Sequence, residues 1–257
     1  MPTIFSDYAS FYDILYQDKD YQGESEFVRA LIAKNENAHA KFSRILDLAC
    51  GTGKHLFVLE EMGFEVEGSD QSLAMVDLAR QSAQKRNSKA VFHHQSFQTA
   101  DQIEKKFDVV LSLFASIGYL VADADLSKAL RNIHGLLNPG GIFIFDFWNG
   151  NAVVRDYSPT KILRKKAGER EIIRHSETKL DRIRQLAEVQ FTCMEFSLDQ
   201  KMAEFSESHV VRYFFLREME FLLFSHGFRL LYQSSMGKLD VPLEPYDWNV
   251  TMMATRK

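Results

Sequence analysis

Hydrophobic and polar positions change their period several times between residues 20 and 147. Short apolar runs at residues 44–49 and 107–114 have the length and composition of buried strands. Residues 20–33 and 124–137 instead carry apolar side chains at helical spacing among charged ones. Strands and helices that alternate in this way predict an α/β fold with a Rossmann-like, doubly wound, mostly parallel sheet.

Local start and stop signals place the remaining elements of this part of the chain. Ser72 is suited to the N-cap of a helix over residues 72–85. Asn138-Pro-Gly-Gly141 predicts a turn before a fifth strand. The other expected elements are a helix over residues 54–62 and strands over residues 64–68, 91–92 and 141–146.

The pattern changes after Trp148. From residue 153 to residue 215, polar and apolar residues alternate with period two, which is typical of an antiparallel meander with one covered face. A helix over residues 216–226 and closing strands over residues 228–233 and 249–254 are expected to follow. We therefore expect a single domain over residues 1–257, made of an N-terminal helical cap (1–40), a cofactor-binding core (41–147), an antiparallel β insertion that forms the substrate pocket (148–215), and a closing helix and strands (216–257).

The composition is that of an ordinary globular protein. Of the 257 residues, 46% are hydrophobic and 26% are charged, which excludes disordered and fibrous classes. The net charge of −4 argues against a general nucleic-acid or membrane surface, so we expect no DNA or membrane partner and disfavour RNA. The eight histidines show no metal-ligand spacing, and no metal is expected. Two cysteines and the lack of a targeting or membrane-spanning segment predict a soluble, cytoplasmic protein. As a separate expectation, the protein is monomeric or homodimeric.

The first predicted strand runs into a glycine turn, Asp47-Leu-Ala-Cys-Gly-Thr-Gly53. Gly51 and Gly53 allow the backbone to approach a ligand at the carboxyl end of a parallel strand, where doubly wound sheets bind ligands. A dinucleotide fingerprint needs a third glycine where the chain has Leu56, which disfavours an NAD-dependent oxidoreductase. No Gly-Lys-Ser/Thr stands at the spacing of a phosphate loop.

Asp70 ends the second predicted strand, 17 residues after Gly53. A carboxylate at this position can accept hydrogen bonds from both hydroxyls of a ribose. A glycine turn without the third glycine, followed by such a carboxylate, suits a nucleoside that lacks a pyrophosphate. S-adenosylmethionine is the common cofactor of that description.

These residues resemble the successive motifs of the class I S-adenosylmethionine-dependent methyltransferases. The motifs are Asp47–Gly53, Gly68-Ser-Asp70 and Leu137-Asn-Pro-Gly-Gly141, and the resemblance extends from about residue 8 to residue 255. A narrower similarity is to small-molecule N-methyltransferases that dimethylate the amino group of nucleotide-linked deoxysugars. The segments that carry it are residues 12–16, 50–55 and 112–120, and the meander after residues 145–148.

The resemblance assigns ten residues to the cofactor site. The methionine half would contact Asp47, Ala49, Gly51 and Gly53, the ribose Asp70, and the adenine Gln71 and Met75. Phe114 would close the pocket, and Tyr16, the catalytic candidate, would fold over the methionine end. Ser96 stands where the family often has an aspartate that meets the adenine amine, so an uncharged hydroxyl would take that place.

The reaction that the resemblance implies is transfer of a methyl group to a small-molecule acceptor, an amine of the aminosugar kind, by in-line displacement with proximity catalysis. S-adenosyl-L-homocysteine would be the other product. O-methylation of a small metabolite, RNA methylation and non-catalytic binding of the cofactor stay open as alternatives. The fourth strand lacks the Asn/Asp-Pro-Pro-aromatic turn of DNA-base methyltransferases.

Several of these residues also have a purely structural interpretation. Tyr16 could equally pack an aromatic helix, and Met75 lies on a helix that must bury one face. His209 is more typical of a hydrogen-bonded core histidine than of a general base. The six basic residues between Lys161 and Arg174 are most simply a solvated face, with recognition of a phosphorylated substrate as the alternative.

Overall fold

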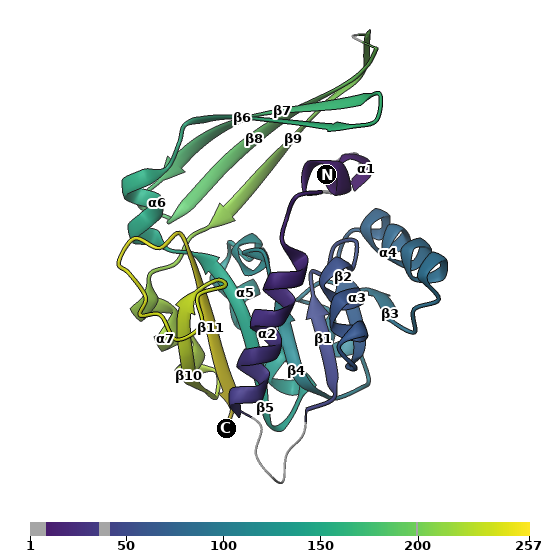
Figure 1. Cartoon of the computed structure of the whole chain (residues 1–257). Coiled ribbons are helices and arrows are strands. Elements are labelled where there is room, and N and C mark those ends of the chain that lie inside the picture. Colours follow the sequence, from purple (N-terminus) through teal and green to yellow (C-terminus); the bar gives the residue numbers. More distant parts are fainter. Residues whose placement is uncertain (1–8, 36–41, 199) are drawn as a thin grey trace.

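A computed structural model describes residues 9–35, 42–198 and 200–257 and contains a central seven-stranded sheet (Figure 1). The strand order is β10-β11-β5-β4-β1-β2-β3. Strands β5, β4, β1, β2 and β3 pair in parallel, whereas β11 pairs antiparallel with both β5 and β10. The bounds are β1 (Arg44–Leu48), β2 (Glu65–Asp70), β3 (Val91–His94), β4 (Phe107–Ser112), β5 (Leu137–Trp148), β10 (Phe228–Ser235) and β11 (Asn249–Arg256). The predicted fold class is confirmed.

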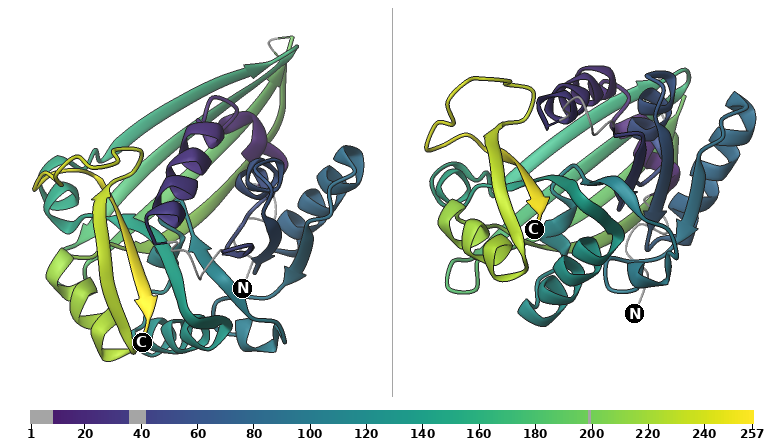
Figure 2. Two further views of the ribbon diagram at one scale, coloured as in Figure 1. Left: turned by 60° about the horizontal axis from the view of Figure 1, so that its bottom comes forward. Right: turned by 90° about the horizontal axis from the view of Figure 1, so that it is seen from below.

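Helices cover both faces of this sheet. Figure 2 shows α2, α3 and α4 on one side and α5 and α7 on the other. Successive residues of β4 serve the two sides: Val110 belongs to the cluster with α5 and α7, whereas Val109 and Leu111 belong to the cluster with α2–α4. The bounds are α2 (Tyr21–Asn35), α3 (Lys54–Glu61), α4 (Leu73–Arg86), α5 (Asp123–Leu136) and α7 (Leu216–Ser225). Two buried faces on one strand explain the consecutive apolar residues Val109–Leu111.

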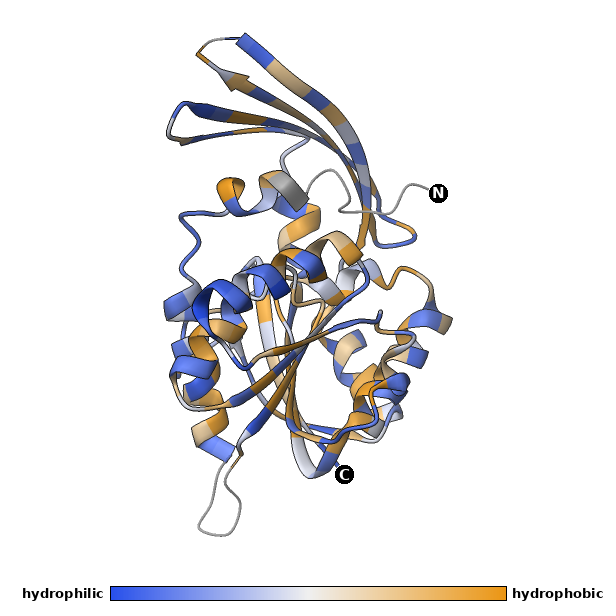
Figure 3. Cartoon of the chain, turned by 90° about the vertical axis from the view of Figure 1, so that its right-hand side faces the viewer, coloured by the Kyte–Doolittle hydropathy of each residue, from blue (hydrophilic) through white to orange (hydrophobic). Residues whose placement is uncertain are grey.

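The segment inserted after β5 forms a second, four-stranded antiparallel sheet with the order β6-β7-β8-β9. Its strands are β6 (Thr160–Ala167), β7 (Arg170–Asp181), β8 (Leu186–Ser197) and β9 (Gln200–Arg212). Figure 1 shows this sheet above the carboxyl ends of the parallel strands, with α1 (Ala9–Leu15) beneath it. In Figure 3 its strands alternate between polar and apolar residues, as the period-two pattern predicts.

The N-terminal helix α1 fastens this second sheet to the rest of the molecule. Phe11 and Leu15 form a buried cluster with Ile172 of β7 and Cys193 of β8. Burying such a side chain contributes about 1.5–3 kcal/mol. Part of the expected cap over residues 1–40 lies outside the described residues, and the domain boundaries stay a prediction.

Two local predictions are wrong. Asn138-Pro-Gly-Gly141 is no separate turn but part of β5: Leu137 pairs with Phe107 and Ile142 with Val109, so the residues between them bulge out of the ladder. Gly140, at φ +75, lets the backbone make that bulge. The expected meander also begins later, because residues 150–156 form a short helix, α6 (Gly150–Asp156), which Asn149 caps.

The Ser72 cap is confirmed, since its hydroxyl accepts a hydrogen bond from the Met75 amide at 3.4 Å. Within the described ranges, no helix is both long enough and apolar enough to cross a membrane.

Candidate functional site

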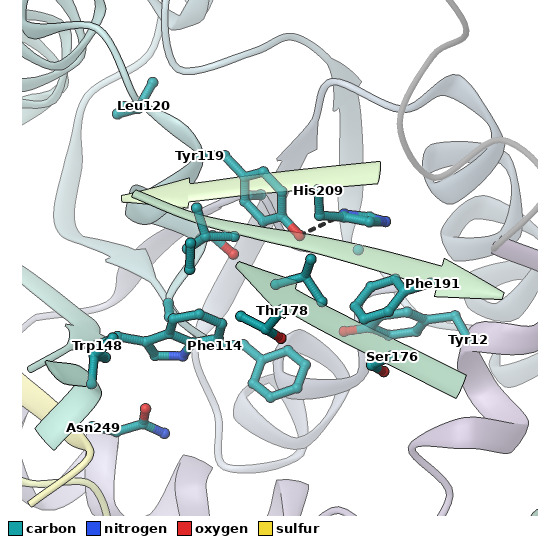
Figure 4. A pocket seen from close by; sticks show the side chains of 18 of the residues that line it. Tyr12, Phe114, Tyr119, Leu120, Trp148, Ser176, Thr178, Phe191, His209 and Asn249 are labelled. Carbon is teal, nitrogen blue, oxygen red and sulfur yellow. Dashed lines mark hydrogen bonds between the residues drawn. The ribbon is translucent and has the colours of Figure 1, made fainter. Parts of the chain in front are cut away.

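A cavity of about 570 Å³ lies between the carboxyl ends of the parallel strands and the inner face of the second sheet (Figure 4). It brings together eight of the ten residues predicted for the site. These are Tyr16, Ala49, Gly51, Asp70, Gln71, Met75, Ser96 and Phe114. The other two, Asp47 and Gly53, lie nearby but do not line it. This volume falls in the range of sites for small molecules.

The two glycines of the first turn have different tasks. Gly51 has φ +55, and a Cβ added to it would meet no atom within 4 Å, so this position is open to a ligand. Gly53 has φ +79, but a Cβ there would lie 2.8 Å from the Phe92 ring. It therefore permits the close packing of α3 against β3 rather than contact with a ligand. Ala49 also has a positive φ, 66°, which marks a constrained backbone beside the cavity.

Asp70 is buried at the end of β2, with both carboxylate oxygens in use. Oδ2 accepts a hydrogen bond from the Gly51 amide at 2.9 Å, and Oδ1 accepts one from the Ser72 amide at 2.8 Å. Burial raises the pKa of this carboxyl, and the two amides oppose that shift. A carboxylate has about four acceptor positions, so each oxygen keeps one for a ribose hydroxyl.

Two more buried acids lie beside Asp70. Burial raises the pKa of Asp47 to about 8, with Asp70 and Asp146 adding repulsion. The pKa of Asp146 is raised to about 7, also by burial, although the Ala115 amide donates to its Oδ2 at 3.0 Å. Oδ1 of each has no hydrogen-bond partner within the described part of the chain. Unpartnered buried oxygens of this kind call for a cation, and the ammonium of an amino-acid ligand fits them.

Phe114 follows β4 in a constrained conformation, with φ 65°, and the next residue, Ala115, has φ 56°. The Tyr16 ring meets the Phe114 ring edge-on at 5.1 Å, and Lys19 Nζ lies 4.4 Å from its centroid. Arg174 Nη1 of β7 donates to Tyr16 Oη at 2.8 Å. Tyr16 is thus held over the end of β4 by contacts with both sheets.

A second cavity, of about 350 Å³, shares Tyr16 and Phe114 with the first. Its lining carries both signs of charge, from Lys19, Glu24 and Asp146 among others. Lys19 pairs with Glu24, whose other oxygen lies 2.7 Å from His55 Nε2. A lining with both signs of charge fits the zwitterionic end of an amino acid.

Known proteins resemble both the sequence and this architecture. A family model for methyltransferase domains matches residues 45–141. The chain is 34% identical over 142 residues to the dTDP-3-amino-3,6-dideoxy-alpha-D-glucopyranose N,N-dimethyltransferase of Streptomyces fradiae, covering 54% of this chain and 52% of that enzyme. It is 27% identical to the dTDP-3-amino-3,4,6-trideoxy-alpha-D-glucopyranose N,N-dimethyltransferase of Streptomyces venezuelae, covering 88% and 92%. Residues 45–141 thus match a methyltransferase domain, and both relatives are methyltransferases by name.

A solved structure shares the complete fold of this chain. An S-adenosylmethionine-dependent methyltransferase from Clostridium acetobutylicum superposes with a TM-score of 0.83 at 21% identity, covering 99% of each chain. At that identity the likeness shows the fold. The match to the S. fradiae enzyme spans about half of that enzyme's length.

The remaining predicted residues, Gln71, Met75 and Ser96, lie near the ends of β2 and β3. Met75 is buried, and Gln71 places its carbonyl oxygen 3.0 Å from His94 Nε2. The Ser96 amide donates to Thr99 Oγ1 at 3.0 Å. All three predicted residues line the cavity there, so its wall at this end is a methionine beside polar backbone and hydroxyl groups.

The basic residues between Lys161 and Arg174 are dispersed over the second sheet. Only Lys161 and Arg174 of these six basic residues line the cavity. The others pair with acids outside it: Lys165 with Asp18, Lys166 and Arg164 with Glu171, and Arg170 with Glu195. Recognition of a phosphate would therefore rest on the two cavity residues.

Several residues that line the two cavities were not predicted, among them Asp146 of the second cavity and Tyr119 of the first. Asp146 carried a usable signal, because it is an acid near the carboxyl end of a parallel strand, like Asp47 and Asp70. Tyr119 lies in a short 3-10 helix, η2 (Ser116–Tyr119), within the segment 112–120 that carries the narrower resemblance, but nothing in that segment distinguishes it from its neighbours. Among the described residues, no group of three or more His, Cys, Asp and Glu side chains is placed to hold a metal ion.

Proposed function

We propose that this methyltransferase methylates the amino group of a small molecule, an aminosugar linked to a nucleotide or a close analogue of one. The observation that carries this is the cavity of about 570 Å³ that the second sheet completes. A cavity of that size admits a small metabolite beside the cofactor but no folded polymer. The two Streptomyces relatives act, by their names, on dTDP-linked aminosugars.

We further propose a place for each part of the cofactor. Asp70 would bind the ribose, and Gln71, Met75 and Ser96 the adenine. Ala49 and Gly51 would lie along the methionine part, and Asp47 and Asp146 would neutralise its ammonium. Gly53 supports the turn by packing against Phe92. The cofactor supplies a methyl group on a positively charged sulfur.

The chain's own contribution to the chemistry is position and exclusion of water. Tyr16 and Phe114 stand where the two cavities meet and would hold the acceptor nitrogen in line with the methyl group. The aromatic rings also tolerate the positive charge that the reaction consumes. Alignment of this kind can lower the barrier by about 7–11 kcal/mol in favourable cases.

Three observations weigh against the alternatives. The dispersed basic run gives RNA no continuous path of positive charge. The alternative of an NAD-dependent oxidoreductase needs a glycine where this chain has Leu56. Leu56 is fully buried, and a Cβ on Gly68 would lie 2.6 Å from it, so the helix and the strand pack closely here without that glycine. A cavity that extends to the second sheet is also more than a cofactor-binding regulator needs. A hydroxyl acceptor remains the second candidate, because a Tyr–His pair in the cavity could remove its proton.

The test is transfer of labelled methyl from S-adenosylmethionine to four acceptors: dTDP-3-amino-3,4,6-trideoxy-glucose, glycine, a simple phenol and total RNA. We expect label on the nitrogen of the aminosugar, located by mass spectrometry. Label only on phenol or only on RNA would overturn the proposal. The cytoplasmic location and the monomeric or homodimeric state stay predictions.

A further inference from the structure

Both tryptophans of the chain lie at one end of the cavity. Trp148 ends β5, Trp248 immediately precedes β11, and both line the cavity. Their rings meet edge-on, with centroids 5.9 Å apart. Figure 4 shows Trp148 at the end of the cavity away from Tyr12 and Phe191. Trp248 is 36% exposed, so solvent reaches this end of the cavity.

One buried asparagine holds the backbone around the two rings. Asn149 is fully buried, and its backbone N–H donates to the Trp248 carbonyl at 2.8 Å. Its Nδ2 donates to the carbonyls of Pro245 and Asp247, each at 3.0 Å. The segment that carries Trp248 is therefore fastened to the residue that follows Trp148. An aromatic surface positioned in advance in this way loses little freedom when a ligand binds to it.

A cation and a hydroxyl line the same cavity from the first two strands of the second sheet. Lys161 of β6 is the cross-strand partner of Ser176 of β7, and both line the cavity. Direct partners on neighbouring strands project from the same face, so the ammonium and the hydroxyl are neighbours. Lys161 has no acid partner within the described part of the chain, unlike Lys165 and Lys166 of the same strand. An ammonium beside a hydroxyl is a suitable donor set for phosphate oxygens.

These two features suit two parts of one ligand. A partly exposed indole binds the flat face of a nucleobase by stacking, and the ammonium attracts a diphosphate. A free aminosugar has neither an aromatic face nor an anionic group and would leave both features unused. A nucleotide-linked aminosugar supplies both. Because the cavity has to hold the cofactor as well, the part of the acceptor that is not methylated would extend to the end that solvent reaches.

We propose that Trp148 and Trp248 stack against the nucleobase of the acceptor, and that Lys161 and Ser176 bind its diphosphate. The proposal rests on the proposed function. It goes beyond that function in giving the nucleotide part of the acceptor a binding site of its own.

The two tryptophans allow a direct test, because all indole fluorescence of the chain comes from this end of the cavity. The probe is dTDP, which carries the base and the diphosphate but no sugar. It is titrated into protein saturated with S-adenosylhomocysteine, so that the cofactor site is filled. We expect saturable quenching as the base stacks on the rings. Calorimetry with the same ligand gives its Kd without reliance on fluorescence.

Thymidine and pyrophosphate separate the two halves of the site. Trp248→Ala should raise the Kd of dTDP and of thymidine about 10-fold and leave that of pyrophosphate unchanged. Trp248→Phe, which keeps an aromatic face, should lose less than threefold. Lys161→Ala should raise the Kd of dTDP and of pyrophosphate about fivefold and leave that of thymidine unchanged. The matched controls are Phe221→Ala, an exposed aromatic of α7, and Lys166→Ala of β6, because neither residue lines the cavity.

Binding of S-adenosylhomocysteine within threefold of the wild type checks that each variant is folded. A folded Trp248→Ala protein that binds dTDP within threefold of the wild type would overturn the base site. Equal kcat/KM for a free aminosugar and for its dTDP-linked form would also overturn the proposal, with methylation of an amine intact. Absence of methyl transfer to any amine overturns the proposed function alone if dTDP binding still depends on Trp248, and overturns both if it does not.

Discussion

Asp70 gives the most direct test of the cofactor site. Its carboxylate already accepts the Gly51 and Ser72 amides and keeps two acceptor positions for the ribose. Replacing it with alanine removes all four acceptor positions at once. Replacing it with asparagine keeps the shape and one acceptor oxygen but removes the charge.

The magnitude follows from the bonds that are lost. A hydrogen bond to a charged group contributes about 1.5–3 kcal/mol, so two ribose hydroxyls at the lower figure give about 3 kcal/mol. At about 1.4 kcal/mol per factor of ten, Asp70→Ala should raise the Kd of S-adenosylhomocysteine about 100-fold. Asp70→Asn, which loses one acceptor and the charge, should raise it about 10-fold.

Isothermal titration calorimetry with S-adenosylhomocysteine measures both values without knowledge of the acceptor. Asp77→Ala is the matched control, because Asp77 is a half-exposed aspartate of α4 that pairs with Arg80 at 3.5 Å. We expect the control to bind like the wild type. If Asp70→Ala also binds within threefold of the wild type, Asp70 does not hold the ribose and the proposed cofactor placement is wrong.

Three further outcomes test other parts of the site. Gly53→Ala should lower the free energy of unfolding in urea by about 1–3 kcal/mol, since its methyl group meets the Phe92 ring at 2.8 Å and φ is +79. Lys161→Ala should raise KM for a nucleotide-linked acceptor without changing cofactor affinity, whereas Lys166→Ala, outside the cavity, should change neither. The folded-state pKa of Asp146, about 7, lies above its ordinary 3.8, so its contribution to stability falls as pH rises from about 4 to about 7. Asp146→Asn removes this loss and should raise Tm more at pH 8 than at pH 5, as measured by scanning fluorimetry.

The parts of the fold that could be predicted are those fixed by local sequence. Ser72 caps its helix because a hydroxyl before an apolar helix satisfies a free backbone amide wherever it occurs. Gly51 and Asp70 were found because both stand at strand ends, and parallel strands bring their carboxyl ends to one edge. The hydrogen bond between the Gly51 amide and the Asp70 carboxylate joins residues 19 positions apart, because the two strand ends meet at that edge.

The predictions that were wrong or incomplete concern residues whose structure depends on partners distant in sequence. Asn138–Gly141 has the residues of a turn, yet pairing of its flanks with Phe107 and Val109 absorbs it into β5. Gly51 and Gly53 are alike in sequence, and only the Phe92 ring, brought in by β3, separates a ligand-facing glycine from a packing one. The period-two pattern shows that alternate residues of β9 share a face, but it does not show which face covers the cavity. The sequence therefore could not place His209 in the cavity wall.

Three carboxylates at one edge of the sheet conflict with stability and therefore indicate function. Asp47 and Asp146 each have a buried oxygen without a partner among the described residues, and both have a raised pKa at least partly from burial. Folding alone would favour uncharged residues there, because an unpaired buried carboxylate costs free energy that nearby amides only partly offset. A ligand that brings a positive charge reverses this cost. The same acids that weaken the empty protein would then strengthen its hold on the cofactor. They lie at the edge of the sheet where the open glycine turn, the strained Phe114 and the cavity coincide.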